Sequence, residues 1–164
     1  MSYVTNREFG DGFLASVRDI VGPLLLEPAP VEMDVGEATD LVVLRARDMR
    51  IGCRVRRGGY CEKYPHDFTL RSRVKSGTRT ERDKIIDGWG DWLFYGHADA
   101  GDIGNWMIVD LHAFRAAFIR GWPVKCGERA NGDGTHFYFY DVTTFPPAPA
   151  VLVASNYIGL RKAA

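Results

Sequence analysis

The chain has 164 residues with 21 basic and 21 acidic side chains, and 46% of its residues are hydrophobic. These values favour one globular domain over residues 1–164 and exclude collagen-like, disulfide-scaffold and disordered proteins. The longest apolar runs are far shorter than the ~20 residues of a membrane helix, and the N-terminus lacks a signal-peptide pattern, so we expect a cytoplasmic protein with no membrane partner.

The first predicted element is a helix over residues 6–21. Apolar residues recur from Phe9 to Ile20 at spacings of four, four and three residues, which forms one apolar stripe on a helix. The Gly-Pro pair at 22–23 ends this helix. A strand-like alternation of apolar and acidic residues follows at 31–35.

Two stronger strand candidates come next, at residues 39–47 and 50–57. Because only two residues clearly separate them, we predict that they form a β-hairpin. Side chains alternate along a strand, so Arg54 and Arg56 are expected to project from one face. Their like charges repel one another unless a counter-charge or a polyanion lies nearby, which makes this face a candidate binding site.

The remaining elements are predicted in this order: a strand at 68–73, a helix at 81–87 capped by Thr80, strands at 91–95 and 106–111, a helix at 111–119, a turn at 131–135 and a strand at 136–142. In the last strand Phe137 and Phe139 share one face, and Tyr138 and Tyr140 share the other, which we expect to be exposed. Residues 145–164 begin with a proline-rich stretch and are expected to be extended or frayed. This order predicts an α+β (or α/β) single domain with a mixed central sheet flanked by helices.

Charge is distributed unevenly along the chain. Residues 1–44 carry two basic and eight acidic side chains, whereas residues 45–84 carry thirteen basic and five acidic ones. Ten of those thirteen are arginines, whose planar guanidinium group binds phosphate oxygens in bidentate fashion. The block therefore indicates a phosphate-bearing or acidic partner; the alternative is a solvated face that pairs with the acidic first segment. The candidate nucleic-acid-binding residues are Arg54, Arg56, Arg57, Arg71, Arg73 and Lys75.

Several familiar signatures are absent from the sequence. There is no phosphate-binding loop, dinucleotide glycine fingerprint, Gly-x-Ser-x-Gly elbow or His-Glu-x-x-His helix. The three cysteines, Cys53, Cys61 and Cys126, match no zinc-binding spacing. Their odd number, without a secretion signal, predicts reduced thiols.

Three stretches together resemble the core of the PD-(D/E)XK nuclease-like superfamily, over roughly residues 8–115. They are ATDLVVL with Asp40, RIGCRVRR with Arg54 and Arg56, and TERDKIIDGWGDWLFYGHAD. The resemblance implies a hydrolase that cleaves phosphodiester bonds. In that family an aspartate and a second acid hold Mg²⁺, and a lysine two residues later orients or polarises the attacking water.

Carried onto this chain, the resemblance makes Asp40 the metal ligand and places Arg54 and Arg56 in the catalytic positions of the second strand. The acid-x-lysine positions fall at Gly52 and Arg54, or at Arg54 and Arg56, and neither choice supplies a carboxylate. Asp40 is equally consistent with an ordinary strand-start or turn residue. The missing acid could come from Glu32, Asp34, Glu37, Asp48, Glu81 or Asp91.

Two functional hypotheses follow. The first is a protein of nuclease-like fold that binds DNA or RNA, either as a Mg²⁺-dependent phosphodiesterase or with that activity lost. The second is a protein-interaction module encoded by a phage or mobile element, which inhibits a host defence complex. In the second case the acidic and basic segments would form complementary patches for a protein partner.

Overall fold

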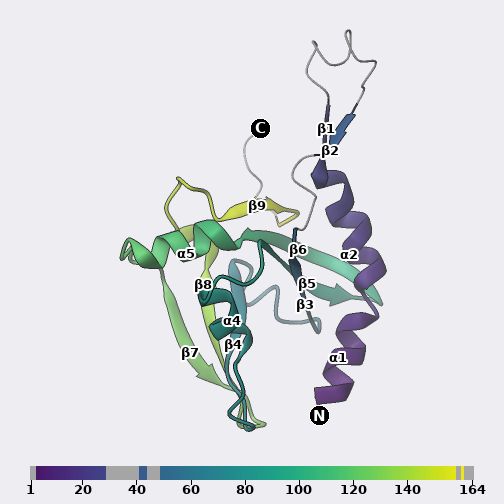
Figure 1. Cartoon of the computed structure of the whole chain (residues 1–164). Helices are drawn as coiled ribbons and strands as arrows, with labels where there is room; N and C mark the ends of the chain where they lie inside the picture. The colour runs from purple at the N-terminus through teal and green to yellow at the C-terminus, as the bar shows by residue number, and fades with distance from the viewer. Residues whose placement is uncertain (1–2, 29–40, 44–48, 158–159, 161–164) are drawn as a thin grey trace.

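A computed structural model of the chain describes residues 3–28, 41–43, 49–157 and 160. The described strands are β1 (Leu26–Pro28), β2 (Leu41–Val43), β3 (Ile51–Arg56), β4 (Asp67–Arg73), β5 (Trp92–Asp99), β6 (Asp102–Asp110), β7 (Cys126–Ala130), β8 (His136–Asp141) and β9 (Leu152–Ser155). The helices are α1 (Tyr3–Asp11), α2 (Leu14–Val21), α4 (Glu81–Ile86) and α5 (Leu111–Ile119), with short 3-10 helices η1 (Gly22–Leu25) and η2 (Val142–Thr144). Figure 1 shows their arrangement, which confirms the α+β class.

The strands form three sheets. The largest has the order β3-β5-β6-β9 and is mixed, because β3 and β5 are parallel whereas β5, β6 and β9 are antiparallel neighbours. The second sheet has the order β4-β8-β7 and is antiparallel throughout. The third contains only β1 and β2. Strand β9 lies within the 145–164 segment, where its pairing with β6 completes the mixed sheet.

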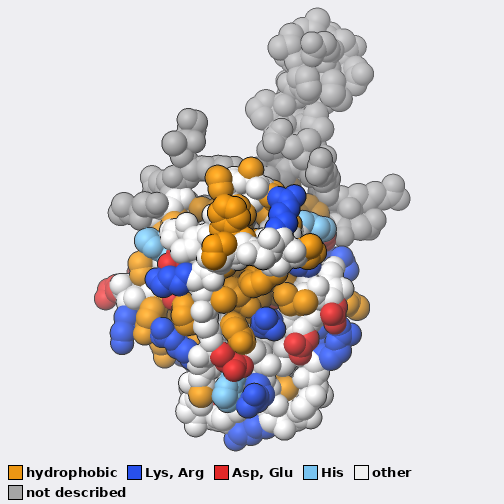
Figure 2. Space-filling view, turned by 90° about the vertical axis from the view of Figure 1, so that its left-hand side faces the viewer, with side chains coloured by type: hydrophobic (Ala, Val, Ile, Leu, Met, Phe, Trp, Pro, Cys, Tyr) orange, Lys and Arg blue, Asp and Glu red, His pale blue; other side chains and the backbone are white. Residues whose placement is uncertain are grey.

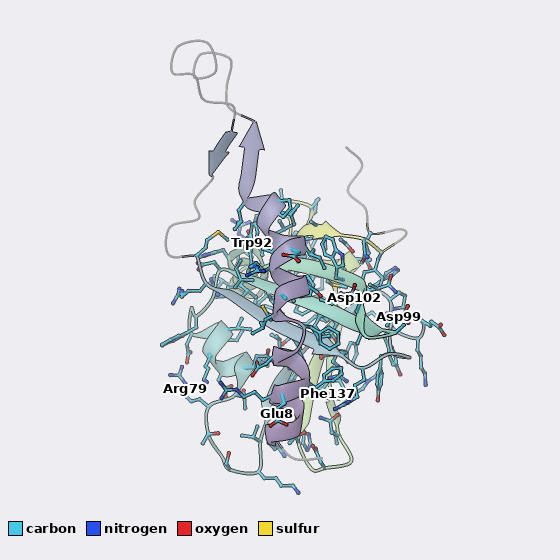
Figure 3. All side chains as sticks on the ribbon, turned by 90° about the vertical axis from the view of Figure 1, so that its right-hand side faces the viewer. Glu8, Arg79, Trp92, Asp99, Asp102 and Phe137 are labelled. Atoms are coloured by element: carbon cyan, nitrogen blue, oxygen red, sulfur yellow. The ribbon has the colours of Figure 1, made fainter. Side chains whose placement is uncertain are left out.

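The predicted helix over residues 6–21 is present as two helices. Gly12 and Phe13 form a turn between α1 and α2, where Gly12 N donates to Glu8 O and Phe13 N donates to Gly10 O, each at 3.1 Å. Glycine at positions 10 and 12 lowers helix propensity at this point. Figure 3 looks onto the two helices, which cross the outer face of the four-stranded sheet. Val17 and Val21 of α2 pack there in a small hydrophobic cluster.

The predicted hairpin between residues 39–47 and 50–57 is wrong. In the described part of the chain, Leu41–Val43 pairs with Leu26–Pro28, and Ile51–Arg56 pairs in parallel with β5. The side-chain alternation along β3 is as predicted: Ile51 and Val55 join the cluster under α2, so Arg54 and Arg56 point to the opposite face. Alternation determines the face of each side chain, but it does not determine which strand lies alongside.

The main hydrophobic core lies between the four-stranded sheet, the three-stranded sheet and α5. Phe68 of β4, Phe114 of α5 and Tyr140 of β8 are fully buried in it, with ring centroids 5.0–5.8 Å apart. The predicted helix at 111–119 is confirmed. The predicted Thr80 cap is also confirmed, because the Thr80 hydroxyl accepts from the backbone N–H of Asp83 at the start of α4.

The prediction of an exposed tyrosine face on the last strand is wrong. Tyr140 is fully buried, and its hydroxyl accepts a 2.8 Å hydrogen bond from Arg82 Nε. Tyr138 packs against the same core. Phe137 and Phe139 on the opposite face are half-buried, as is Tyr138. The sequence pattern separated phenyl from tyrosyl side chains correctly, but a tyrosine is readily buried when its hydroxyl finds a partner.

The prediction of reduced cysteines is confirmed. Cys53, Cys61 and Cys126 are all free thiols. Within the described ranges, no helix has the length and apolar character needed to cross a lipid bilayer.

Candidate functional site

A cavity of about 300 Å³ opens between the carboxyl ends of β3 and β5 and one face of the three-stranded sheet. We call it the aromatic cavity, because five of its lining residues are aromatic: Tyr60, Tyr64, Tyr95, Phe137 and Phe139. Its charged and polar side chains include those of Arg56, Arg129, His97, Thr69, Asp67 and Asn131. Tyr60 and Tyr64 come from the 57–66 segment, which connects β3 to β4.

Strand register brings arginine and phenylalanine together on one face of the three-stranded sheet. Phe137 lies opposite Arg71 of β4 on one side and opposite Arg129 of β7 on the other. Directly opposite residues in antiparallel strands share a face, so the three side chains form a row across the sheet. In Figure 3, Phe137 lies below the strands of the four-stranded sheet.

The next position along the same face carries Phe139, opposite Thr69 on β4 and Gly127 on β7. A Cβ atom placed on Gly127 would come within 2.8 Å of the Phe139 ring. Glycine at 127 therefore leaves the space in which this ring lies. Sequence reasoning did not predict β7, because CGERA has neither a β-branched run nor an apolar alternation.

Two guanidinium groups lie between pairs of aromatic rings at this cavity. Cζ of Arg56 is 5.2 Å from the Tyr60 ring centroid and 5.7 Å from that of Phe137. Cζ of Arg129 is 5.1 Å from the Tyr64 centroid and 4.6 Å from that of Phe139. All four distances fall within the ~6 Å range of cation–π attraction. The two arginines thus join the 57–66 segment to β8.

Neither of these two guanidinium groups forms an ion pair with a carboxylate of the described residues. Among the described residues, Asp67 is the only acidic side chain that lines the aromatic cavity. Burial, followed by the neighbouring charge of Asp141, raises the pKa of the Asp67 carboxyl. The cavity therefore presents a net positive charge with stacked planar groups, which suits an anionic partner that carries aromatic rings.

The inner wall of the cavity is polar and uncharged. His97 is only 3% exposed, and its Nδ1 lies 2.5 Å from the Tyr157 hydroxyl. Burial, and then the charge of Arg56, lowers the pKa of His97 to about 4, so its ring is neutral at pH 7. His97 lines the cavity, and with Nδ1 held by the Tyr157 hydroxyl its remaining hydrogen-bonding atom is Nε2.

The structure brings together some of the arginines predicted from sequence and separates others. Arg56 lines the aromatic cavity and Arg71 lies in the row beside it. Arg54 shares the face of Arg56, but it forms an ion pair with Glu81 and its side chain is only 16% exposed. Arg57 stacks over Phe9 of α1, with Cζ 4.2 Å from the ring centroid.

The ion pair of Arg54 has a clear structural cause. Helix α4 packs against β4, and this places Glu81 at the inner face of β3. The same carboxylate oxygen of Glu81 accepts a 3.1 Å hydrogen bond from the backbone N–H of Arg71. Because Arg54 is paired with the carboxylate of Glu81, its guanidinium is not available to bind a phosphate.

Arg73 and Lys75 are exposed at and just beyond the end of β4.

Two of the acids predicted to complete a Mg²⁺ site, Glu81 and Asp91, are described, and both already have partners. No group of three His, Cys, Asp or Glu side chains in the described ranges could hold a metal ion. Glu81 is bound by Arg54, and Asp91 accepts from the backbone N–H of Arg50 and lies 3.0 Å from Nε2 of His112. The predicted ligand Asp40, together with Glu32, Asp34, Glu37 and Asp48, lies outside the described residues.

Only a weak sequence signal indicated the cavity residues that were not predicted. Tyr60 and Tyr64 are four residues apart, and Tyr64 N donates to Tyr60 O at 3.0 Å, so a helical turn carries both rings. Nothing in the local sequence of His97 or Arg129 indicated that either would line the cavity.

Comparison with known proteins adds no assignment: no protein-family model, curated protein or solved structure matches the chain.

Proposed function

We propose that this protein binds single-stranded nucleic acid at the aromatic cavity and the adjoining face of the three-stranded sheet. The observation that carries the proposal is the pair of guanidinium groups, Arg56 and Arg129, each within cation–π distance of two aromatic rings and forming no ion pair with a carboxylate of the described residues. The N–H groups of an arginine that packs over a ring face lie in the plane of its own guanidinium, where they can bind phosphate oxygens.

The aromatic side chains favour a single strand over a duplex. Bases in a duplex are stacked on one another and offer only their edges, whereas an open strand offers their faces. Proteins that bind single strands combine a basic groove with aromatic side chains on which bases stack. Phe137, Phe139, Tyr60 and Tyr64 provide such rings here, and Arg71 extends the positive charge along the same face.

A salt titration tests this proposal. With phosphate contacts from Arg56, Arg71 and Arg129, the logarithm of the binding constant should fall with the logarithm of salt concentration with a slope of about −2, since each contact to a single strand contributes about −0.7. Fluorescence anisotropy with labelled oligo-dT and oligo-rU measures it. Absence of binding to either oligonucleotide at low salt would refute the proposal.

A protein-interaction module remains the second candidate, and one observation favours it. Trp89 is 58% exposed and Ile119 is 86% exposed, near the ends of α4 and α5. The Arg115 guanidinium joins these ends, because it donates to the carbonyl oxygens of Ile85, Trp89 and Gly90. Figure 2 views this side of the molecule, where hydrophobic side chains gather between scattered Lys and Arg.

A pull-down from host lysate separates the two candidates. A protein partner should stay bound after nuclease treatment and should be lost from a Trp89→Ser variant. Proteins that are carried by nucleic acid should disappear after nuclease treatment and should be unaffected by that substitution.

A further inference from the structure

We infer that the aromatic cavity receives one unstacked nucleobase of the bound strand, an inference that rests on the proposed function. The cavity volume of about 300 Å³ is at the lower end of the ~300–1,000 Å³ range of small-molecule sites. It therefore fits one planar heterocycle with part of its sugar. Arg56 and Arg129 lie among the lining residues and can hold the phosphates that flank this base.

The spacing of the aromatic rings supports a planar occupant. The Arg56 guanidinium already lies between the rings of Tyr60 and Phe137, and the Arg129 guanidinium between those of Tyr64 and Phe139. The cavity is thus lined by flat groups. A nucleobase is a larger flat π system, and inside the cavity it gains attraction from the lining rings and from the guanidinium planes that pack on them.

The hydrogen-bonding groups on the inner wall of the cavity suit the uncharged edge of a base. His97 lines this wall, and with Nδ1 held by the Tyr157 hydroxyl its Nε2 is the ring nitrogen left for an occupant. Thr69 Oγ1 and the Tyr95 hydroxyl lie 3.2 Å apart and line the same wall. These groups are hydrogen-bonding but neutral, and they match the edge of a base. A phosphate is instead expected to bind the guanidinium groups of Arg56 and Arg129, which line the same cavity.

The test compares a short oligodeoxynucleotide with an oligomer of equal length whose sugars are all abasic, so that charge is constant and only the bases differ. Wild-type protein should bind the base-bearing strand about tenfold more tightly, or better, as expected for stacking of one base. The Tyr60→Leu/Tyr64→Leu variant should lose this preference while it keeps its affinity for the abasic strand. Trp89→Leu is the matched control, because it removes an exposed aromatic ring outside the cavity.

The outcomes are distinguishable. Equal affinity of the wild-type protein for both strands overturns the base pocket but leaves the proposed function intact. Failure to bind either strand overturns both. Retention of the preference in the double-leucine variant, with an unchanged thermal unfolding midpoint, also overturns the base pocket. A 2-aminopurine reporter in the base-bearing strand should show quenched fluorescence on binding to the wild type and to Trp89→Leu, but not to the double-leucine variant.

Discussion

Replacement of Arg56 and Arg129 together by alanine is expected to weaken binding of a single-stranded oligonucleotide by about 100-fold. Each guanidinium contributes a charge-assisted contact to phosphate, for which a loss of about 1.5 kcal/mol is typical, and two such losses correspond to about two orders of magnitude. Fluorescence anisotropy at constant salt measures the change, and the slope of the salt titration should fall from about −2 to about −0.7 as two of three phosphate contacts disappear.

A double variant with the same change in net charge serves as the control. Arg7 and Arg18 lie on α1 and α2, are largely exposed and pair with Asp11 and Asp19. Their replacement by alanine should change affinity less than about threefold, because surface charges away from the site act mainly through screened long-range attraction. Equal losses in the two double variants would show that binding depends on total charge and not on the aromatic cavity.

The second large effect concerns the pH dependence of stability. The pKa of His97 is about 4 in the folded protein, against 6.5 for an unperturbed histidine, because the ring is buried and lies near Arg56. Between those pH values the unfolded chain binds a proton at this position that the folded chain does not. Stability must therefore rise with pH in this window, and it should fall by about 3 kcal/mol as pH is lowered from about 7 to about 4.

The His97→Asn variant isolates this contribution, because its amide can keep a hydrogen bond to the Tyr157 hydroxyl but does not titrate. Urea unfolding of both proteins at several pH values gives the difference in free energy of unfolding. The advantage of the wild type should shrink by about 3 kcal/mol from pH 7 to pH 4. The raised pKa of Asp67 acts in the opposite direction, but it is present in both proteins and cancels in the difference. A difference that is independent of pH would show that His97 is not buried in neutral form.

The elements that depend on local chemistry were predictable from sequence. The α5 bounds and the Thr80 cap of α4 follow from periodicity and capping residues a few positions apart. The face on which Arg54 and Arg56 lie follows from the two-residue period of a strand. The partner of β3 was not predictable in this way, since pairing with β5 joins residues about 40 positions apart and depends on which apolar strand is buried beside it.

The sequence predicted that arginines would form the candidate site, but it did not predict which residues line it. The arginine-rich block contains Arg56 and Arg71, which the structure places at or beside the cavity, but it also contains Arg54, which Glu81 neutralises. Arg129 and His97 come from outside the block. They reach the cavity only because β5 and β7 lie in different sheets that face one another across it. The nuclease-like core and its Mg²⁺ site stay predictions, and Asp40 is the residue on which they depend.

The most direct measurement is photocrosslinking of a single-stranded oligonucleotide that carries 5-bromodeoxyuridine, followed by mass spectrometry of the crosslinked peptides. Our account predicts crosslinks to the rings of Tyr60, Tyr64, Phe137 or Phe139. Crosslinks confined to Trp89 and Trp122, with none to those four aromatic residues, would contradict it.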